Sequence, residues 1–407
     1  MPFPARVHSA SGPDRILFIL ALGTLSAVSP MATDMYLASM PALADFYSVP
    51  VSTIQLSLST YMVGMAVGQF LLGPVSDVMG RHRLLVGGTT LFLFSSLGVV
   101  FSTDVTMLLI LRGVQGFAGA AGVVIARAIV SDIASGVEAA KLYSLLGMIV
   151  SVAPIVAPVL GGLIATWAPW QVVFWALTGF GALMVACVLF VIPETLPPSL
   201  RRQDGLLGSV RSAAAVVRNR SFMLWALTLS LGFGSLFSYI SASSFVMQNV
   251  VGLSSMGYSI AFATAAAGSV IAGLVNVRLL NRFTPAQIIM VALSTQAAIN
   301  ALGLVGVLMG APVWTIMVHT IASQSCVGFV MGNAIALAQA QVPGRGGSGS
   351  AVQGLMQFMV GGIVSPLAGL GGEHTAVPMS ILMFVLTVGA WGTALLAVSG
   401  STGQRSE

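Results

Sequence analysis

The chain has 407 residues, of which 57% are hydrophobic and only 7% are charged, and its formal net charge is +5. Soluble proteins are nearer a quarter charged, so this composition excludes an ordinary soluble protein and predicts an all-α membrane protein. A basic balance by itself suggests a nucleic-acid partner, but the placement of the charges along the chain gives a different explanation.

Twelve apolar runs follow one another along the chain. A helix needs about 20 apolar residues to cross the hydrocarbon core of a bilayer. The polar N-terminus is followed by a long apolar run without a small-residue cleavage site, so we expect a retained first span and no signal peptide. The predicted spans are 16–38, 53–73, 84–102, 105–126, 142–165, 171–192, 222–246, 258–280, 286–309, 313–336, 350–371 and 378–399.

The basic residues predict the orientation of these spans. With the N-terminus inside, 15 of the 16 Lys and Arg residues fall on the inner side, and the six outer loops hold none. This positive-inside pattern predicts a multi-pass protein of the cell (inner or plasma) membrane with both termini in the cytoplasm. The positive charge is thereby explained by topology, and no nucleic-acid partner is expected.

The longest inner segment, 194–221, carries PETLPP and then five arginines, and it separates six spans from six. It predicts an N-terminal six-helix bundle over 1–193, a cytoplasmic linker, and a C-terminal bundle over 222–407. The halves echo each other, because APVLGG at 157–162 and SPLAG at 365–369 stand 208 residues apart. Such a repeat predicts a substrate site between the halves at mid-membrane.

The loop between spans two and three reads GPVSDVMGRHR, with Gly73, Asp77, Gly80 and Arg81 at fixed spacing. It resembles the loop motif G-x-x-x-D-x-x-G-R-[KR] of the major facilitator superfamily, with His82 in place of the usual second basic residue. The alternative interpretation is a positive-inside turn with a capping aspartate.

In that superfamily the acid and the arginine of the loop pair with an acid at the inner end of span four. The matching residue here is Asp132, in ARAIVSD. The resemblance therefore implies that Asp77, Arg81 and Asp132 form a conformational latch, which holds the two halves in the outward-facing state.

Spans four and five carry two further motifs. Arg112 and Gln115 match the superfamily's R-x-x-Q-G pattern, and A-P-x-x-G-G in span five resembles the antiporter motif G-P-x-x-G-G. The proline removes a backbone donor and the glycines allow close helix approach, so this span can bend and pack tightly. Ordinary small-residue packing is the alternative. The antiporter-motif residues are Ala157, Pro158, Gly161 and Gly162.

The first two spans, SPMATDMYLASMPAL and STIQLSLSTYMVGMAVGQFLLGPVSD, resemble the Bcr/CflA group of drug/proton antiporters, although Ser39 replaces a signature proline. The group includes bicyclomycin, chloramphenicol and florfenicol exporters. The resemblance covers the chain and is most specific over residues 30–165. It implies a major facilitator fold of 12 transmembrane helices in two pseudo-symmetric six-helix bundles. It also implies export of a small molecule against protons. We expect a functional monomer without a cofactor or metal.

Asp34 and Arg112 are the only charged residues predicted inside the membrane, where a charge costs about 2.5–3.5 kcal/mol on insertion scales. We hypothesise that Asp34 carries the proton and that Arg112 gates it by contact. His319 lies near the repeat position of Arg112 and titrates near neutral pH, so it is a further proton-coupling candidate. The alternatives are a static ion pair, an interfacial Asp34, and a histidine that serves only packing.

Other polar residues in or beside the spans are candidates for a substrate cavity, although hydrogen bonds between helices explain most of them equally well. They are Tyr36, Tyr61, Gln69, Gln115, Tyr239, Gln248 and Asn333. The 21 methionines suit an adaptable apolar pocket. The expected substrate is neutral or weakly polar and amphiphilic.

Other functions have weaker support. ATP-driven transport is disfavoured because the only lysine, Lys141, does not follow a glycine as in a Walker A loop. An intramembrane hydrolase would use Ser348, within the G-x-S-G of 346–349, with His319 as base. A gated channel or receptor and a proton-coupled metabolite or sugar importer are the remaining alternatives. A transporter that is not an enzyme is the favoured interpretation.

Overall fold

The computed structural model describes residues 13–134, 136–201 and 205–403. Within these ranges the chain is helical and contains no strand, which confirms the all-α prediction. Eleven of the described helices are long and apolar enough to cross a membrane alone, and a bent N-terminal pair makes twelve when it is counted as one span. The chain is therefore a multi-pass membrane protein.

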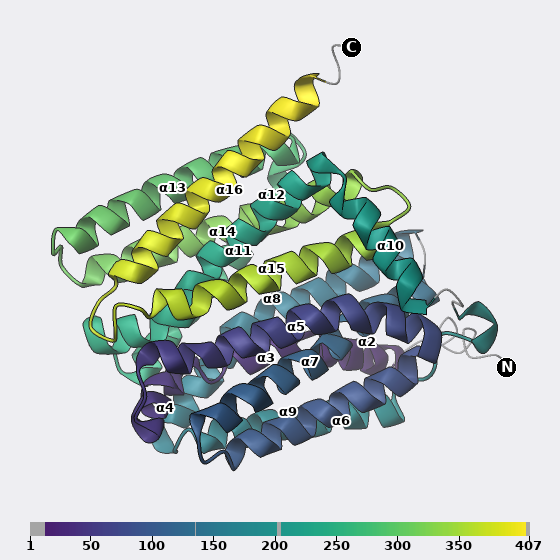
Figure 1. The fold of residues 1–407 in the computed structure, drawn as a ribbon, viewed down its shortest axis with the longest axis horizontal. Coiled ribbons are helices and arrows are strands. Elements are labelled where there is room, and N and C mark those ends of the chain that lie inside the picture. Colours follow the sequence, from purple (N-terminus) through teal and green to yellow (C-terminus); the bar gives the residue numbers. More distant parts are fainter. Residues whose placement is uncertain (1–12, 135, 202–204, 404–407) are drawn as a thin grey trace.

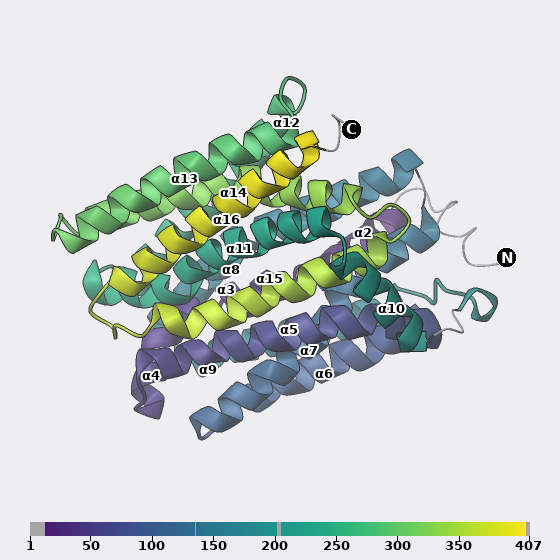
Figure 2. The same ribbon diagram turned by 45° about the horizontal axis from the view of Figure 1, so that its top comes forward.

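The helices form two groups that follow the order of the chain (Figures 1 and 2). The N-terminal group comprises α2 (Pro13–Ser26), α3 (Val28–Asp34), η1 (Leu37–Ser39), α4 (Met40–Tyr47), α5 (Val51–Met79), α6 (Arg81–Val100), α7 (Val105–Ile133), α8 (Gly136–Trp167) and α9 (Gln171–Phe190). After the turn η2 (Pro198–Leu200) and the linker helix α10 (Gly205–Val217) come α11 (Arg220–Phe245), η3 (Val246–Val250), α12 (Ser255–Leu279), α13 (Pro285–Leu308), α14 (Trp314–Ala340), α15 (Gly346–Ala368) and α16 (Val377–Gly403).

The first predicted span, 16–38, is present as a bent pair of helical segments. The chain bends by 44° between α2 and the segment Val28–Tyr47. Pro30 stands just after the bend and has no N–H to donate to the carbonyl four residues earlier, which weakens a helix at this point. The segment beyond Asp34 continues through η1 into α4 and ends at Tyr47.

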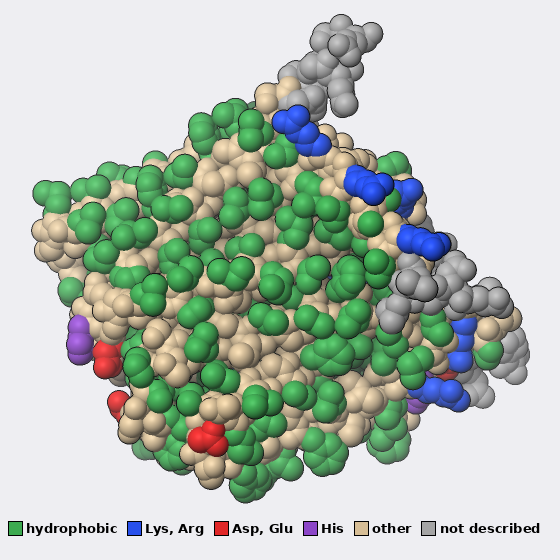
Figure 3. Space-filling model, in the orientation of Figure 1, with side chains coloured by type: hydrophobic (Ala, Val, Ile, Leu, Met, Phe, Trp, Pro, Cys, Tyr) green, Lys and Arg blue, Asp and Glu red, His purple; other side chains and the backbone are tan. Residues whose placement is uncertain are grey.

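The charges separate along the helix axes (Figure 3). Lys and Arg side chains gather at one end of the molecule, where α10 lies, and the visible acidic side chains lie mainly at the other. We call these the arginine-rich end and the opposite end. The separation follows from the alternating direction of successive helices and agrees with the predicted distribution of basic residues.

The two halves meet along two pairs of helices, α5 with α15 and α8 with α12. Near the opposite end, Gln55 Nε2 donates to Ser241 O at 2.9 Å, Ser365 Oγ donates to Gln55 O at 3.0 Å, and Gln248 Nε2 donates to Ala38 O at 3.2 Å. These bonds close the opposite end between the halves.

Towards the arginine-rich end, the contact between the halves is apolar and close. Phe70 of α5 packs against the apolar cluster of the C-terminal half, which contains Trp225 and Val352. A Cβ atom on Gly354 of α15 would overlap the side chain of Gln69. The halves are therefore packed together at this level of α5 as well as near the opposite end.

Candidate functional site

Arg112 is fully buried and lies among three aromatic rings, which we call the Arg112 pocket. Its Cζ atom is 4.4 Å from the ring centroid of Tyr36, 4.6 Å from that of Tyr61 and 6.0 Å from that of Phe174. The negative faces of aromatic rings attract a guanidinium group, and the attraction is strongest where water is excluded. The pocket thus holds a positive charge inside the N-terminal half, and no carboxylate of a described residue forms an ion pair with it.

Arg112 also donates hydrogen bonds within this pocket. Its Nη1 bonds the carbonyl oxygen of Ala32 at 3.0 Å and the side chain of Gln115, which in turn donates to Ser96 Oγ at 2.7 Å. Ala32 lies in α3, and its carbonyl would normally accept from the N–H four residues later. That residue is Tyr36, which is outside the helix. A backbone carbonyl left open in a membrane is costly, so Arg112 stabilises the broken first crossing. Its Nε and Nη2 have no hydrogen-bond partner among the described residues.

Asp34 is the last residue of α3 and is only 4% exposed. Its Oδ1 accepts a hydrogen bond from Thr33 Oγ1 at 2.8 Å. Both Asp34 and Arg112 are described, and no ion pair within 4.0 Å joins them, so the structure does not show a static pair. Both nevertheless interact electrostatically with Tyr36, and Tyr258 of the C-terminal half also lies within electrostatic range of Asp34.

Small residues allow α5 and α7 to approach closely enough to build this pocket. A Cβ atom on Gly116 would overlap the carbonyl oxygen of Tyr61, and one on Gly64 would overlap that of Gly113. The R-x-x-Q-G motif therefore contributes a charge, a polar partner and a close helix contact. The three roles together explain the spacing of the motif, because each falls on a different residue of one helix face.

The glycines of the antiporter motif contact different parts of the molecule. Ala157 and Pro158 are buried within α8. A Cβ atom on Gly161 would overlap the carbonyl oxygen of Met35, directly after Asp34, whereas one on Gly162 would overlap Ser259 of α12. One turn of α8 thus touches the first crossing just beyond the end of α3, and the C-terminal half at the same level.

The predicted loop residues are brought together at the arginine-rich end. Arg81 Nη1 lies 2.6 Å from Asp77 Oδ1, and its Nε lies 3.0 Å from Asp132 Oδ2. Gly80 has a φ of +96°, which favours glycine at the turn between α5 and α6. Gly73 lies on α5 against Val124 of α7.

The linker also joins this cluster, which sequence reasoning missed. Glu194 Oε1 accepts from the backbone N–H of Arg81 at 2.9 Å, and Thr195 Oγ1 donates to Asp132 Oδ2 at 3.0 Å. Arg201 pairs with Glu194 at 3.4 Å. The PETLPP segment, which contains Glu194 and Thr195, was the part of the sequence that could have indicated this contact. All these partners belong to the N-terminal half and the linker, so in this state the cluster attaches the linker to one half.

His319 lies in a different place from the Arg112 pocket. It is in α14 of the C-terminal half, where its ring packs so closely on Gly303 of α13 that a Cβ atom there would overlap it. Neither ring nitrogen has a partner among the described residues. The structure therefore brings Asp34 and Arg112 into one environment and leaves His319 apart from them.

The cavity candidates divide into three kinds. Tyr36, Tyr61 and Gln115 form or support the Arg112 pocket. Gln69 and Gln248 lie where the halves meet, and Tyr239 stacks on Phe262 with centroids 5.5 Å apart. Asn333 instead donates to Asn276 Oδ1 at 2.8 Å and to Phe329 O at 2.9 Å, which places it in the packing of α12 against α14.

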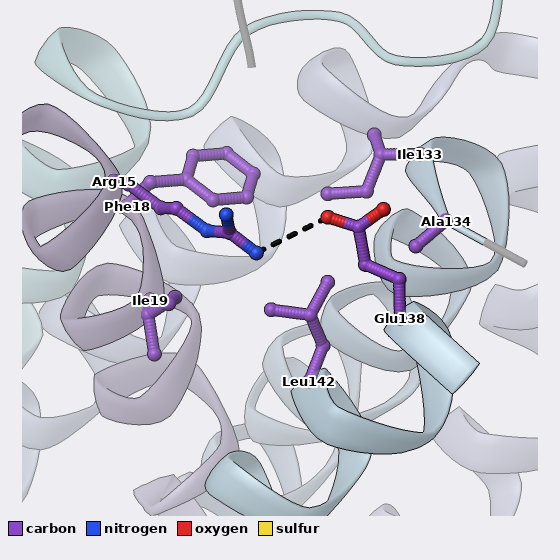
Figure 4. A pocket seen from close by; sticks show the side chains of 7 residues that line it. All are labelled: Arg15, Phe18, Ile19, Ile133, Ala134, Glu138 and Leu142. Atoms are coloured by element: carbon purple, nitrogen blue, oxygen red, sulfur yellow. Dashed lines mark hydrogen bonds and ion pairs between the residues drawn. The ribbon is translucent and has the colours of Figure 1, made fainter. Parts of the chain in front are cut away.

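Two pockets lined by described residues are too small for a drug-sized ligand, which needs about 300 Å³ or more. One holds about 20 Å³ beside the ion pair of Arg15 Nη2 with Glu138 Oε1, 3.1 Å apart (Figure 4). The other holds about 140 Å³ between α5, α6 and α7. Neither lies between the halves.

The hydrolase interpretation finds no matching geometry. Ser348 Oγ donates to Ser212 Oγ at 2.8 Å at the arginine-rich end of α15. His319 is five residues into α14 from the opposite end, so most of the membrane thickness separates the two side chains. The nucleophile and its imagined base do not meet.

Comparison with known proteins defines the class of this chain. The Major Facilitator Superfamily model matches residues 22–366, so the chain belongs to that family. It is 35% identical to the uncharacterized MFS-type transporter YdgK of Bacillus subtilis, with 94% of this chain and 95% of that protein covered.

Two further relatives bear names that fit the sequence resemblance. The bicyclomycin resistance protein homolog of Haemophilus influenzae is 28% identical, with 90% of this chain and 92% of that protein covered. The chloramphenicol resistance protein of Pseudomonas aeruginosa is 32% identical over 66% of this chain and 62% of that protein. These relatives confirm the resemblance to drug antiporters of this superfamily.

Solved structures confirm the fold. A D-xylose-proton symporter superposes with a TM-score of 0.75, with 93% of this chain and 98% of that one covered. At 13% sequence identity this similarity concerns the fold alone. The predicted major facilitator architecture is thus confirmed.

Proposed function

We propose that this protein is a proton-coupled antiporter that exports small, largely apolar or amphiphilic compounds by alternating access. The arginine-rich end faces the cytoplasm, and the protein acts as a monomer in the cell membrane. The observation that carries the proposal is the position of Asp34. It is a buried acid at the C-terminal end of α3 in the bent first crossing, beside the Arg112 pocket and next to the residue that Gly161 contacts.

The free donors of Arg112 supply a mechanism for coupling. In this state its charge is stabilised by aromatic faces, by the Ala32 carbonyl and by the Gln115 side chain, while Nε and Nη2 have no partner among the described residues. An ionised Asp34 would be drawn to those donors, whereas a protonated Asp34 would not. Loading and loss of a proton therefore favour two different positions of the broken segment.

The same segment transmits that change to the other half. Asp34 precedes Met35, whose carbonyl packs on Gly161, and the adjacent Gly162 packs on Ser259 of α12. A shift of the broken segment must move α8, and α8 forms one of the two contacts between the halves. Protonation and opening between the halves are thus physically connected, and the proton gradient supplies about 2.3 kcal/mol per charge per 100 mV plus the pH term.

The substrate site lies between the halves in this proposal. Unpartnered buried polar atoms occur there, on Gln55 and Ser59 of α5 and on Tyr239 of α11. They offer hydrogen bonds but no formal charge, which fits a neutral or weakly polar ligand. The names of the relatives make bicyclomycin-like and chloramphenicol-like compounds the first to test.

His319 and the loop cluster have supporting roles in the proposal. His319 offers a second proton-binding group in the C-terminal half. In the outward-facing state, the halves are latched by the cluster of Asp77, Arg81 and Asp132. In the closed state described above, the loop between α5 and α6 is instead bonded to the linker through Glu194.

The decisive experiment is drug efflux in an efflux-deficient bacterium, with and without an uncoupler. The wild type should lower sensitivity to one or more compounds of a panel, and the uncoupler should remove the effect. Asp34→Asn should abolish it, whereas Asp45→Asn, which changes an exposed acid near the opposite end, should not. Uncoupler-sensitive efflux by Asp34→Asn would refute the proton assignment. Coupled uptake of a sugar or metabolite, without resistance to any drug, would favour the importer.

A further inference from the structure

The two halves differ in how their basic residues are neutralised at the arginine-rich end. In the N-terminal half and the adjoining linker, Arg15, Arg81 and Arg201 each pair with an acid. Among described residues 205–403 the only acid is Glu373, near the opposite end, where it accepts from Asn249 Nδ2. The same stretch holds six exposed arginines, namely Arg211, Arg218, Arg220, Arg278, Arg282 and Arg345.

The linker helix α10 and the residue directly after it present two of these arginines, Arg211 and Arg218, together with an apolar stripe. Val210, Ala214 and Val217 are exposed at helical spacing, with each valine 47% exposed. Arg211 and Arg218 lie along the edge of this stripe, seven residues or about 10 Å apart. A helix face that combines apolar residues with flanking arginines is typical of the interface between a bilayer and water.

The other face of α10 is attached to the C-terminal half, which fixes the direction of the stripe. Val216 is fully buried in the apolar cluster of that half. Ser348 Oγ donates to Ser212 Oγ at 2.8 Å, and Asn219 Nδ2, just after the helix, donates to Gln341 O at 2.9 Å. The exposed stripe is therefore held away from the protein, at the end where the arginines gather (Figures 1 and 3).

We propose that this face of α10 binds anionic phospholipid headgroups of the adjacent leaflet. Charge complementarity selects this partner, because no described acid of the C-terminal half neutralises the arginines at this end. The exposed valines would lie against the acyl boundary, while the guanidinium groups reach the phosphates. Each basic residue next to an anionic surface contributes about 1 kcal/mol, so loss of two should weaken binding about 30-fold.

The test uses the purified full-length protein and a fluorescent phosphatidylglycerol, with a phosphatidylcholine analogue for comparison. The variant Arg211→Gln/Arg218→Gln should lose preferential binding of phosphatidylglycerol, and Arg211→Lys/Arg218→Lys should retain it. The matched control Arg15→Gln/Lys141→Gln removes two basic charges from the N-terminal half and should bind as the wild type does. Size-exclusion profiles and thermal melting establish that each variant is folded.

Equal binding of the two lipids by the wild type would overturn the proposal. An equal loss in the glutamine variant of α10 and in the control would overturn it too, because the effect would then follow net charge alone. Binding of an acidic protein through α10 without a preference for phosphatidylglycerol would assign the face to a different partner. None of these results depends on which compound the protein exports.

Discussion

Gly162 offers a direct test of how the closed state is held. In the closed structure a Cβ atom at this position would overlap the Oγ atom of Ser259 and lie 2.6 Å from its Cβ, across the contact of α8 with α12. Overpacking of this kind typically costs about 1–3 kcal/mol. Because the contact joins the halves, Gly162→Ala should raise the free energy of the closed state. It should not change the free energy of a state in which α8 and α12 have separated. The ratio of open to closed molecules should rise about 5- to 150-fold.

Double electron–electron resonance measures this change directly. Spin labels at Asp45→Cys, an exposed position of α4, and at His374→Cys, on an exposed loop of the other half, would report a longer distance near the opposite end in a larger fraction of molecules. The native cysteines, Cys187 and Cys326, would first be replaced by serine. The matched control is Gly147→Ala in the same helix, where an added Cβ would meet nothing within 4 Å.

An unchanged distance distribution in Gly162→Ala, with the label pair responsive to substrate or pH, would refute the reasoning. It would show that α8 and α12 are not separated when the opposite end opens. An equal change in Gly147→Ala would assign the effect to helix propensity, because alanine is favoured over glycine in any helix.

Three further substitutions test the proposed roles. Arg81→Ala leaves Asp77 and Asp132 without their shared cation, so we expect transport to be lost. The amount of protein in the membrane, measured on immunoblots, should stay within about twofold of wild type. Normal transport by this variant would refute the latch. Arg112→Met forfeits two charge-assisted hydrogen bonds of about 1.5–3 kcal/mol each but relieves about 2.5–3.5 kcal/mol of membrane charge cost, so the melting temperature should fall only slightly while coupled efflux disappears. A large drop in melting temperature would show that the role of Arg112 is chiefly structural. His319→Gln should reduce uncoupler-sensitive efflux severalfold. Unaltered efflux would show that His319 serves only to pack against Gly303 and does not bind the transported proton.

The architecture was predictable because the bilayer imposes a simple pattern on the chain. Apolar runs of sufficient length and arginines on one side predict the number and order of the crossings. The helix ends were less predictable, since α5 runs to Met79 although its apolar run ends near residue 73. Hydropathy marks the portion inside the lipid, and a helix continues beyond it until a residue such as Gly80 ends it.

The site was only partly predictable for a different reason. Single residues such as Asp34 and Arg112 stand out in the sequence because a charge in a membrane is expensive. Their partners do not stand out, since Arg112 is stabilised by the rings of Tyr36 and Tyr61 and by the carbonyl oxygen of Ala32. A backbone carbonyl has no signature in a sequence, and an aromatic residue within a span is ordinary. The linker bond of Glu194 was missed because nothing in PETLPP specifies its partner.

The hydrogen bonds between the halves have a consequence for evolution. Of those formed by described residues, the bonds of Gln55, Ser365 and Gln248 each pair a side chain with a main-chain carbonyl. A substitution at the accepting residue therefore leaves the acceptor in place, so only one position per bond is constrained. The residues that accept these bonds can therefore change during evolution without loss of the hydrogen bonds that close the opposite end.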